Sequence, residues 1–255
     1  MAHTFHDLNI QSALSSGDDP PEEIAARAET LELNRIAISD YLTDHEHYEE
    51  LASKIDDIET DVDIHTGVKI RADDPKELND KISAFRDRVD VVLVHGGDVP
   101  INRAACEDGR VDILAHPEFK RKDSGIDHVL AKKAASNRVA IELNFKSVLK
   151  TYGKLRSQIM NHMQRNIRLA EKYNAPMVLC SGARRVEEMR HPRDMAGFAN
   201  CMGLDLSDAF DLVEKHPRQI IQRVEEAHSD EQVRPGVEVE ETSQTTLDEQ
   251  GESDE

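Results

Sequence analysis

The chain of 255 residues contains no tryptophan, and aromatic residues make up only 4% of it. Its three cysteines, Cys106, Cys180 and Cys201, are too few and too far apart for a disulfide framework or a paired-cysteine metal site, so we expect reduced thiols. No apolar run reaches the ~18 residues of a membrane span. The first residues combine no basic segment with an apolar run, so we expect a cytoplasmic protein with no export signal and no membrane partner.

Charge is abundant but unevenly distributed. The chain has 51 Asp and Glu against 32 Lys and Arg, which gives a net charge of −19. Residues 119–193 reverse this balance, with 17 Lys and Arg against 6 Asp and Glu. A cationic region on an acidic protein predicts an anionic partner, with chance clustering on a solvated helix face as the alternative. The acidic excess elsewhere is typical of a high-salt cytoplasm, where nucleic-acid binding depends on hydrogen bonds and shape more than on bulk charge.

Short continuous apolar runs alternate with helical patterns along most of the chain. Seven runs predict strands, at residues 5–10, 36–39, 62–70, 89–94, 111–115, 139–143 and 177–180. Continuous runs are typical of parallel strands that are covered on both faces. The repeated alternation favours an α/β fold, a TIM-like (β/α) barrel with seven strands, over an open doubly wound sheet.

Helix signals agree with this alternation. Asp74 before Pro75 predicts a capped helix start, and the spacing of Thr43 and Glu46 is that of a capping box. Further helices are expected over residues 125–136, 147–172, 195–202 and 207–223. We expect one barrel domain over residues 1–224. Residues 225–255, with 1 Lys or Arg against 12 Asp or Glu, predict a disordered acidic tail.

Polar side chains stand at the ends of the expected strands. In a barrel these ends meet at one mouth, where catalytic groups usually lie. Asp, His and Glu side chains from neighbouring strands are the ligands of a water-activating metal site, although a structural role is the alternative for each histidine. The side chains at these ends are Asp7, Asn9, Asp40, Lys69, Arg71, His95, His116, Glu142, Asn144 and Ser181.

Two of the strand ends have features that suit phosphate. Gly96 and Gly97 follow His95 and could expose backbone N–H groups, with an ordinary tight turn as the alternative. Arg184 and Arg185 follow the seventh strand, and their guanidinium groups match phosphate geometry. A surface salt bridge is the alternative for this arginine pair.

Several strings, taken in order along the chain, resemble one protein family. They lie at residues 93–97, 101–108, 112–118, 123–131, 141–145 and 181–183. Together they are similar to protein component 3 of archaeal ribonuclease P, the family of the eukaryotic 30 kDa subunit, over residues 5–224. The resemblance implies a subunit of the ribonucleoprotein that removes 5′ leaders from precursor tRNA. It also implies that ribonuclease P RNA, with Mg²⁺, carries the catalysis, and that this chain acts with protein component 2 and other protein subunits.

The same resemblance implies a barrel related to the polymerase and histidinol phosphatase (PHP) phosphoesterases, whose metal ligands are largely replaced here. Asn9 and Gln11 stand where those enzymes have two histidines, Tyr41 replaces a third histidine, and Lys69 replaces a glutamate. A cation in place of a carboxylate repels a divalent metal and attracts phosphate. We therefore expect no catalytic residue and no metal on this chain. The vestigial ligand candidates are His95, His116 and Glu142.

The leading hypothesis is a non-catalytic subunit that positions RNA through its backbone, touching precursor tRNA only indirectly. Aromatic residues are few, so shape recognition is favoured over base stacking. The alternatives are a metal-dependent PHP-type phosphoesterase with altered ligands and a protein-only scaffold for component 2. The predicted RNA contacts are Lys69, Arg71, Arg103, Lys120, Arg121, Lys122, Lys146, Lys150, Lys154, Arg156, Arg165, Arg168, Arg184 and Arg185.

Overall fold

The computed structural model describes residues 3–228, 232–234 and 237–238. Seven parallel strands pair in chain order to form one sheet, so each strand neighbours the next in sequence. The seven predicted apolar runs are all strands in the structure. They are β1 (His6–Ile10), β2 (Arg35–Asp40), β3 (Asp63–Ile70), β4 (Val91–His95), β5 (Ile113–Ala115), β6 (Ala140–Asn144) and β7 (Met177–Cys180).

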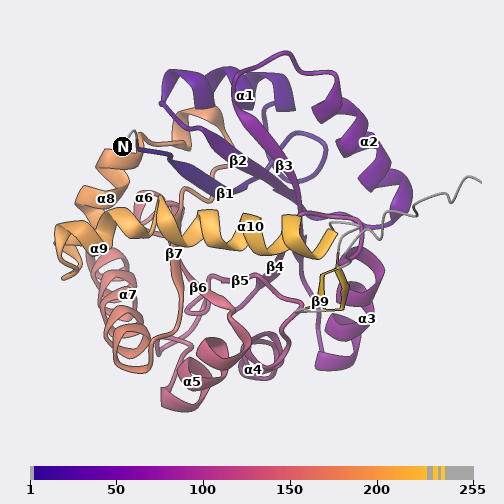
Figure 1. Ribbon diagram of the computed structural model, residues 1–255. Coiled ribbons are helices and arrows are strands. Elements are labelled where there is room, and N and C mark those ends of the chain that lie inside the picture. Colours follow the sequence, from indigo (N-terminus) through magenta and orange to yellow (C-terminus); the bar gives the residue numbers. More distant parts are fainter. Residues whose placement is uncertain (1–2, 229–231, 235–236, 239–255) are drawn as a thin grey trace, which may run out of the picture.

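Helices connect the strands and surround the sheet (Figure 1). None of those in the described part of the chain has the length and apolar character needed to cross a membrane. They are α1 (Pro21–Thr30), α2 (His45–Asp56), α3 (Pro75–Phe85), α4 (Val99–Glu107), α5 (His128–Asn137), α6 (Phe145–Leu149), α7 (Gly153–Tyr173), the 3-10 turn η1 (Val186–Glu188), α8 (Pro192–Cys201), α9 (Leu206–Asp211) and α10 (Lys215–His228).

The sheet curls into a nearly closed barrel. The backbone N–H of His6 in β1 donates to Val213 O at 2.9 Å, and the N–H of Leu179 in β7 donates to Leu212 O at 3.1 Å. The connection between α9 and α10 therefore bridges the two edge strands where the barrel would otherwise be open. At the other end, Gln11 N donates to Ala183 O at 2.9 Å. The seven-stranded barrel predicted from the sequence is confirmed.

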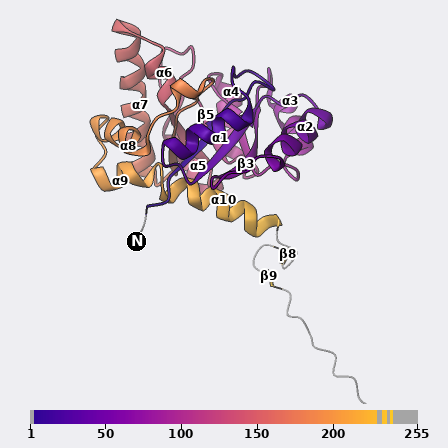
Figure 2. The same cartoon turned by 90° about the horizontal axis from the view of Figure 1, so that it is seen from above.

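Helix α10 closes the end of the barrel at which the strands begin (Figures 1 and 2). Its Ile220 and Ile221 pack against a small interior cluster that includes Leu8, Val91 and Leu93. A larger apolar layer lies between the outer face of the sheet and the surrounding helices. Because α10 seals this end, the opposite end, where the strands finish, forms the mouth.

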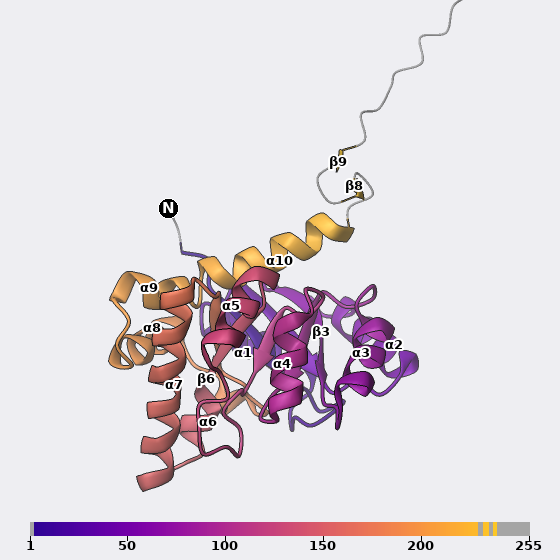
Figure 3. The ribbon, with the colours of Figure 1, turned by 90° about the horizontal axis from the view of Figure 1, so that it is seen from below.

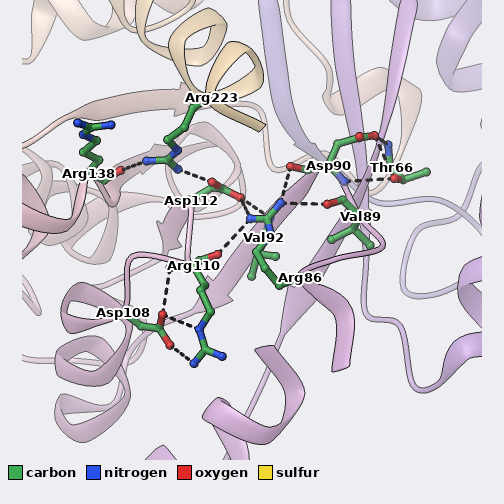
Figure 4. Close-up of polar contacts among 10 residues, drawn as sticks. All are labelled: Thr66, Arg86, Val89, Asp90, Val92, Asp108, Arg110, Asp112, Arg138 and Arg223. Carbon is green, nitrogen blue, oxygen red and sulfur yellow. Dashed lines mark hydrogen bonds and ion pairs between the residues drawn. The ribbon is translucent and has the colours of Figure 1, made fainter. Parts of the chain in front are cut away.

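A buried carboxylate fastens α10 to the sheet (Figure 4). Asp112, 1% exposed, accepts from Arg86 Nη1 at 2.5 Å, from Arg223 Nη2 of α10, and from the N–H of Val92 at 2.8 Å. Arg86 also donates to three backbone carbonyls, and Arg223 donates to Arg138 O at 3.0 Å. Two guanidinium groups thus balance one carboxylate, and all three bind further partners, as burial of charge requires.

The structure corrects several helix predictions. The expected helix over 147–172 is two helices, because residues 150–152 break it and Gly153 adopts φ +56°, a left-handed conformation that favours glycine. The helix expected over 207–223 is likewise divided into α9 and α10. The cap of α2 is Asp44, which accepts from His47 N at 3.0 Å, rather than Thr43. The cap at Asp74 is confirmed.

The predicted domain boundary at residue 224 falls within helix α10. Helix α10 continues to His228, and two short strands follow, β8 (Gln232–Arg234) and β9 (Val237–Glu238), which pair antiparallel. The prediction of a disordered tail otherwise falls on residues 229–231, 235–236 and 239–255, which lie outside the described residues.

Helix α7 extends past the barrel on the side of the mouth, away from α10 (Figures 2 and 3). Its first turns, with α6, therefore form a wall beside the mouth. The loop that joins β5 to α5 lies across from this wall and completes a cleft there. Segments far apart in the sequence thus surround the mouth.

Candidate functional site

A lysine occupies the centre of the mouth. The side chain of Lys69, in β3, is 1% exposed, and its ammonium donates to Asn9 Oδ1 at 3.2 Å and to His116 Nε2 at 3.1 Å. Because an ammonium only donates, the Nε2 atom of His116 accepts, which places the ring proton on Nδ1, 3.4 Å from Ser147 Oγ. Three strand ends are thereby tied together by one cation.

Glu142 supplies the negative charge next to this lysine. Its Oε1 accepts from Asn9 Nδ2 at 2.5 Å and from Asn144 Nδ2 at 3.1 Å, while Oε2 accepts from the N–H of His116 at 3.2 Å. Both oxygens therefore have partners within the protein. The carboxylate orients Asn9, and Asn9 in turn orients Lys69.

Burial and positive charge act together on the titratable groups of the mouth. Burial lowers the pKa of Lys69 to about 8, against which Glu142 acts. Burial, followed by the charge of Lys69, lowers the pKa of His95 to about 3 and that of His116 well below its usual value. Both histidines are therefore neutral near pH 7, which agrees with a ring nitrogen that accepts from an ammonium.

These residues do not fit a divalent metal ion. The ammonium of Lys69 lies between Asn9 and His116, and an approaching metal ion would meet a like charge there. The vestigial candidates offer few free ligand atoms: Glu142 is saturated by three donors, and both ring nitrogens of His116 have partners. His95 Nδ1 lies 2.9 Å from the hydroxyl of Tyr41, and its Nε2 is without a hydrogen bond in the described part of the chain. Such a site lacks the several free ligands that zinc or manganese needs.

Elsewhere, one group of three side chains has metal-ligand atoms within 4.8 Å of one another among the described residues: Asp63, His65 and Glu225. It lies where β3 begins, at the sealed end of the barrel. Arg35 already binds Asp63 at 2.9 Å and lies 3.6 Å from Glu225. Arg35 therefore already offsets part of the negative charge of this cluster, which is separate from the mouth.

Tyr41, which the sequence resemblance aligned with a histidine of the PHP enzymes, is part of the mouth. Its hydroxyl pairs with His95, and Lys69 and Arg71 lie over its ring with 5.8 and 5.1 Å to the centroid. The ring of His95 also meets Phe119 edge to face at 4.9 Å. An aromatic and cationic layer thus covers the buried network. The sequence could have indicated Tyr41 as a residue of the mouth, because it stands where the PHP resemblance leads one to expect a histidine.

Two buried carboxyl groups at the strand ends have structural partners. Asp7 accepts from Ser181 N at 3.2 Å, and burial raises its pKa to about 6. Asp40 accepts from Ser12 N at 2.8 Å and from Ser12 Oγ at 2.5 Å, and burial raises its pKa as well. Asp7 thus holds the loop after β7, and Asp40 holds the loop after β1. These contacts explain why both carboxyl groups are buried at the mouth.

The glycines after His95 make an ordinary turn. Gly96 N donates to Ala115 O at 2.7 Å, and Gly97 N donates to Asn102 Oδ1 at 2.9 Å. Both N–H groups are used within the protein. The hypothesis of a backbone phosphate site at this turn is therefore wrong, because neither N–H is left for a phosphate oxygen, and the alternative of an ordinary turn is confirmed.

Most of the predicted RNA contacts lie around the mouth, since parallel strands end at the same edge. Lys154 and Arg156 lie in the first turn of α7, and Arg165 and Arg168 lie further along the same helix. Arg103 is on α4, where its Nε lies 3.3 Å from Glu107 Oε1. The remaining predicted contacts lie in the segments that follow β3, β5, β6 and β7. They are Arg71, Lys120, Arg121, Lys122, Lys146, Lys150, Arg184 and Arg185.

The structure removes Lys69 from this set of predicted RNA contacts. It was expected to contact RNA backbone, but its ammonium lies inside the barrel and is bound to Asn9 and His116. The arginine pair is exposed, and Arg185 Nε lies 3.4 Å from Glu187 and 3.8 Å from Asp18. Salt bridges therefore exist at Arg185, and its contact with phosphate stays a prediction.

The sequence did not indicate the cleft beside the mouth. This space of about 330 Å³, here called the α7 cleft, lies between Phe119 in the loop after β5 and Leu155 and Ile159 of α7. Glu118 also lines it and is 5% exposed. Its formation depends on the break before Gly153, which aims α7 past the mouth, so no local pattern could have revealed it.

With this geometry established, comparison with known proteins gives a family. The model of the family described as RNase P subunit p30 matches residues 4–229. The chain belongs to this family. Ribonuclease P protein component 3 of Methanosarcina mazei is 35% identical to it over 238 residues, 92% of this chain and 95% of the relative. The same component of Methanococcoides burtonii is 35% identical over 244 residues, 96% and 97% of the two chains.

Solved structures agree with the family assignment. A chain in the cryo-EM structure of archaeal ribonuclease P with mature tRNA has a TM-score of 0.77 and 32% identity, covering 93% of this chain and 100% of that one. A Xaa-Pro dipeptidase with bound methionine has a TM-score of 0.57 at 9% identity over 88% and 76% of the two chains, a likeness of fold alone. The resemblance seen in the sequence, to a ribonuclease P protein subunit, is confirmed.

Proposed function

We propose that this chain supports the catalytic RNA of ribonuclease P, during removal of 5′ leaders from precursor tRNA, without carrying out the cleavage itself. The observation that carries this proposal is the buried ammonium of Lys69 at the centre of the mouth. A hydrolytic barrel enzyme places its metal ion and attacking water at the mouth. Here a protein cation fills that region, and the Mg²⁺ required for chemistry belongs to the RNA.

The exposed cations around the mouth supply the surface for RNA. Arg71, the pair Lys120 and Lys122, and Arg184 follow three separate strand ends, those of β3, β5 and β7. Lys154 and Arg156 extend the same side along α7. Lysine and arginine contacts to phosphates fix the register of an RNA without reading its bases. Such a surface suits a protein that stabilises a folded RNA. The more distant Arg103, Arg165 and Arg168 would meet RNA only if it reached past the mouth.

Protein component 2 is the proposed protein partner. The named relatives are components of the same ribonucleoprotein, and the archaeal structure contains a chain of this fold together with mature tRNA. The cationic side is assigned to RNA in this proposal, so component 2 is expected on a different face. Contact with precursor tRNA is expected to be indirect, through the ribonuclease P RNA.

Reconstitution of precursor-tRNA cleavage from purified parts tests the proposal. Omission of this chain at limiting protein is expected to lower the cleavage rate, and replacement of Arg184 and Arg185 by Glu is expected to weaken assembly with the RNA while the fold is kept. A Lys215→Glu variant is the control, because this exposed residue lies on α10 at the sealed end. Unchanged cleavage without the chain would contradict the proposal.

Two further measurements separate the alternatives. A phosphoesterase would bind stoichiometric metal when purified without chelator, and its activity would disappear in a His116→Ala variant. The Lys69 network argues against this outcome. A protein-only scaffold would leave the chemical footprint of the RNA unchanged while protein assembly stays intact. Protection of the RNA backbone by this chain is the expected result.

A further inference from the structure

The α7 cleft has an apolar floor. Phe119 is 39% exposed and Leu155 is 55% exposed, and both line the cleft with the partly buried Ile159. Exposed apolar side chains that gather in a hollow mark binding sites more often than those scattered singly. The other large exposed apolar residues, such as Val129 and Leu206, do not line this cleft.

Cations surround this floor, and two of them form no ion pair with the residues that the structure describes. Lys150 pairs with Glu188, and Arg121 pairs with Asp123 at 2.6 Å. Lys146 is partly buried, and its ammonium makes no hydrogen bond or ion pair with the described residues. Burial lowers the pKa of Lys146, the charges of Glu188 and Glu142 act against this, and the charges of Arg184 and Lys150 add to the lowering. An anion placed here would relieve that repulsion.

Lys120 is the second cation without an acidic partner among the residues that the structure describes. Its ammonium lies 5.1 Å from the centroid of the Phe119 ring, so positive charge and aromatic surface adjoin at the edge of the cleft. Cation–π contact of this kind is weak at an exposed site. A negatively charged ligand could therefore draw Lys120 from the ring and free the ring face.

Glu118 adds an independent sign of a missing partner. Its side chain is 5% exposed, it lines the cleft, and its buried Oε2 has no hydrogen bond in the described part of the chain. Leaving a buried polar atom unpaired is costly, and such atoms in native proteins usually have a partner. A donor on the edge of a ligand in the cleft would satisfy this oxygen.

The apolar floor matches the face of a base, the unpaired cations at the rim match a phosphate, and the buried carboxyl oxygen of Glu118 matches a donor on the edge of the base. We propose that the α7 cleft binds one unpaired nucleotide of the ribonuclease P RNA, with its base against Phe119 and Leu155 and its phosphate near Lys120 and Lys146. This inference rests on the proposed function and assigns a distinct site within it. An acidic peptide could satisfy the two lysines, but an apolar side chain in the cleft would leave Glu118 unpaired.

Chemical probing of base accessibility tests the inference on complexes of the full chain with ribonuclease P RNA. Wild-type protein is expected to protect one unpaired base that a Phe119→Ala, Leu155→Ala double variant leaves reactive. The variant should also bind the RNA about tenfold more weakly, as loss of one base-stacking contact predicts. A Val129→Ala, Leu206→Ala double variant is matched in exposure and is expected to behave like wild type.

The salt dependence of RNA affinity distinguishes the proposed base contact from the proposed phosphate contact. The slope of log affinity against log salt is expected to be unchanged in the Phe119→Ala, Leu155→Ala variant. It should become shallower by about 0.7 in a Lys120→Ala, Lys146→Ala variant, since the two lysines share one phosphate and each single-strand phosphate contact contributes about 0.7. Thermal unfolding of each variant, and the single Leu155→Ala variant on the exposed helix face, control for loss of fold.

Unchanged base reactivity and affinity in the stacking variant would overturn the inference. So would loss of contact with another protein subunit, rather than with RNA, on mutation of the cleft. If Arg184→Glu and Arg185→Glu still weaken assembly in that case, the proposed function stands and only the cleft is wrongly assigned. If removal of the whole chain changes neither cleavage nor RNA protection, the proposed function fails as well.

Discussion

Lys69 shows how a buried charge can be retained without a counter-ion in direct contact. Its ammonium has two neutral acceptors, Asn9 Oδ1 and His116 Nε2, and the nearby carboxylate of Glu142 reaches it through Asn9. Burial of an ammonium disfavours its charged form, which is why the pKa of Lys69 falls to about 8. Near pH 7 the lysine is still mainly charged, so the network holds a fixed positive centre.

Replacement of Lys69 by Met is expected to lower the free energy of unfolding by about 2 kcal/mol, because Asn9 and His116 lose a buried donor and Glu142 loses the nearby positive charge. The salt slope of RNA binding should stay as in the wild type, since the ammonium does not reach the surface. Urea unfolding and filter binding measure the two effects. In the control, Arg71→Met, stability should be kept and the slope should become shallower. A shallower slope for Lys69→Met would show that it reaches RNA.

Glu118 gives a prediction for pH. Burial raises its pKa from 4.5 to about 7, so between these values the folded protein holds a proton that the unfolded chain has released. The stability of the wild type therefore falls across this interval as the pH rises. Glu118→Gln cannot release that proton. The variant should match the wild type at pH 4 and exceed it by about 3 kcal/mol at pH 7.5, the equivalent of the shift at 1.36 kcal/mol per pH unit.

Urea unfolding of both proteins at the two pH values measures this difference. The comparison with the variant is needed because His6, His95 and His116, whose pKa values are lowered, act in the opposite direction. A difference between the two proteins that does not depend on pH would mean that Glu118 is ionised in the folded state.

Helix α10 is held by one charged cluster and one apolar contact. Asp112 lies between Arg86, which comes from the end of α3, and Arg223 of α10. Ile220 and Ile221 fill the interior beneath them. The charged cluster fixes the position of the helix, while the isoleucines exclude water from the barrel. The seal of the barrel thus depends on Asp112, the residue before β5, which in the sequence is only a polar position within an apolar run.

Asp112→Asn should lower the free energy of unfolding by about 3 kcal/mol, since two partly buried guanidinium groups lose their counter-charge. Lys215→Ala is the control on the same helix. It removes an exposed pair with Asp211 at 3.1 Å, and a change below about 0.5 kcal/mol is expected. Denaturant unfolding followed by circular dichroism measures both. Equal effects of the two substitutions would show that the cluster adds no more than a surface pair.

The sequence pattern is informative for strands and less so for helix ends. The strands were predictable because each is buried on both faces, and a run such as 89–94 then contains almost no polar residue. The break between α6 and α7 was missed, because Lys150, Thr151 and Tyr152 fit a helical pattern and Gly153 alone marks the turn. The bridge at Leu212 and Val213 has no local signal, since its hydrogen bonds go to strands far away in sequence.

For the site, the sequence predicted which residues share the mouth, because parallel strands end together. It did not predict that Lys69 is enclosed, since its burial depends on closure of the barrel. The position of Glu118 in the lining of the α7 cleft was missed for a related reason. Only the packing of α7 against the loop after β5 turns that residue towards a cleft. The sequence was therefore sufficient to locate residues at the strand ends. It was not sufficient to predict the environment of a residue where that environment is formed by segments distant in sequence.

The charge of the molecule is divided between a cationic region, residues 119–193, and an acidic remainder. With a net charge of −19, like charges repel one another when the chain is compact, and this repulsion opposes folding. In the proposed function, the same acidic surface would repel RNA, and contact would be made through the cationic region. The division therefore favours one orientation of the protein on a polyanion.

Salt is expected to stabilise the fold for this reason. Raising KCl from 0.1 M to 1 M shortens the screening length from about 10 Å to about 3 Å and so weakens repulsion across the surface. The exposed ion pairs contribute little, so their screening should not offset the gain. We expect the melting temperature to rise by several degrees in calorimetry. Glucose of equal osmolality is the control, because it changes solvation without screening charge. A melting temperature that falls with KCl, or rises equally with glucose, would show that self-repulsion does not limit the stability of this protein.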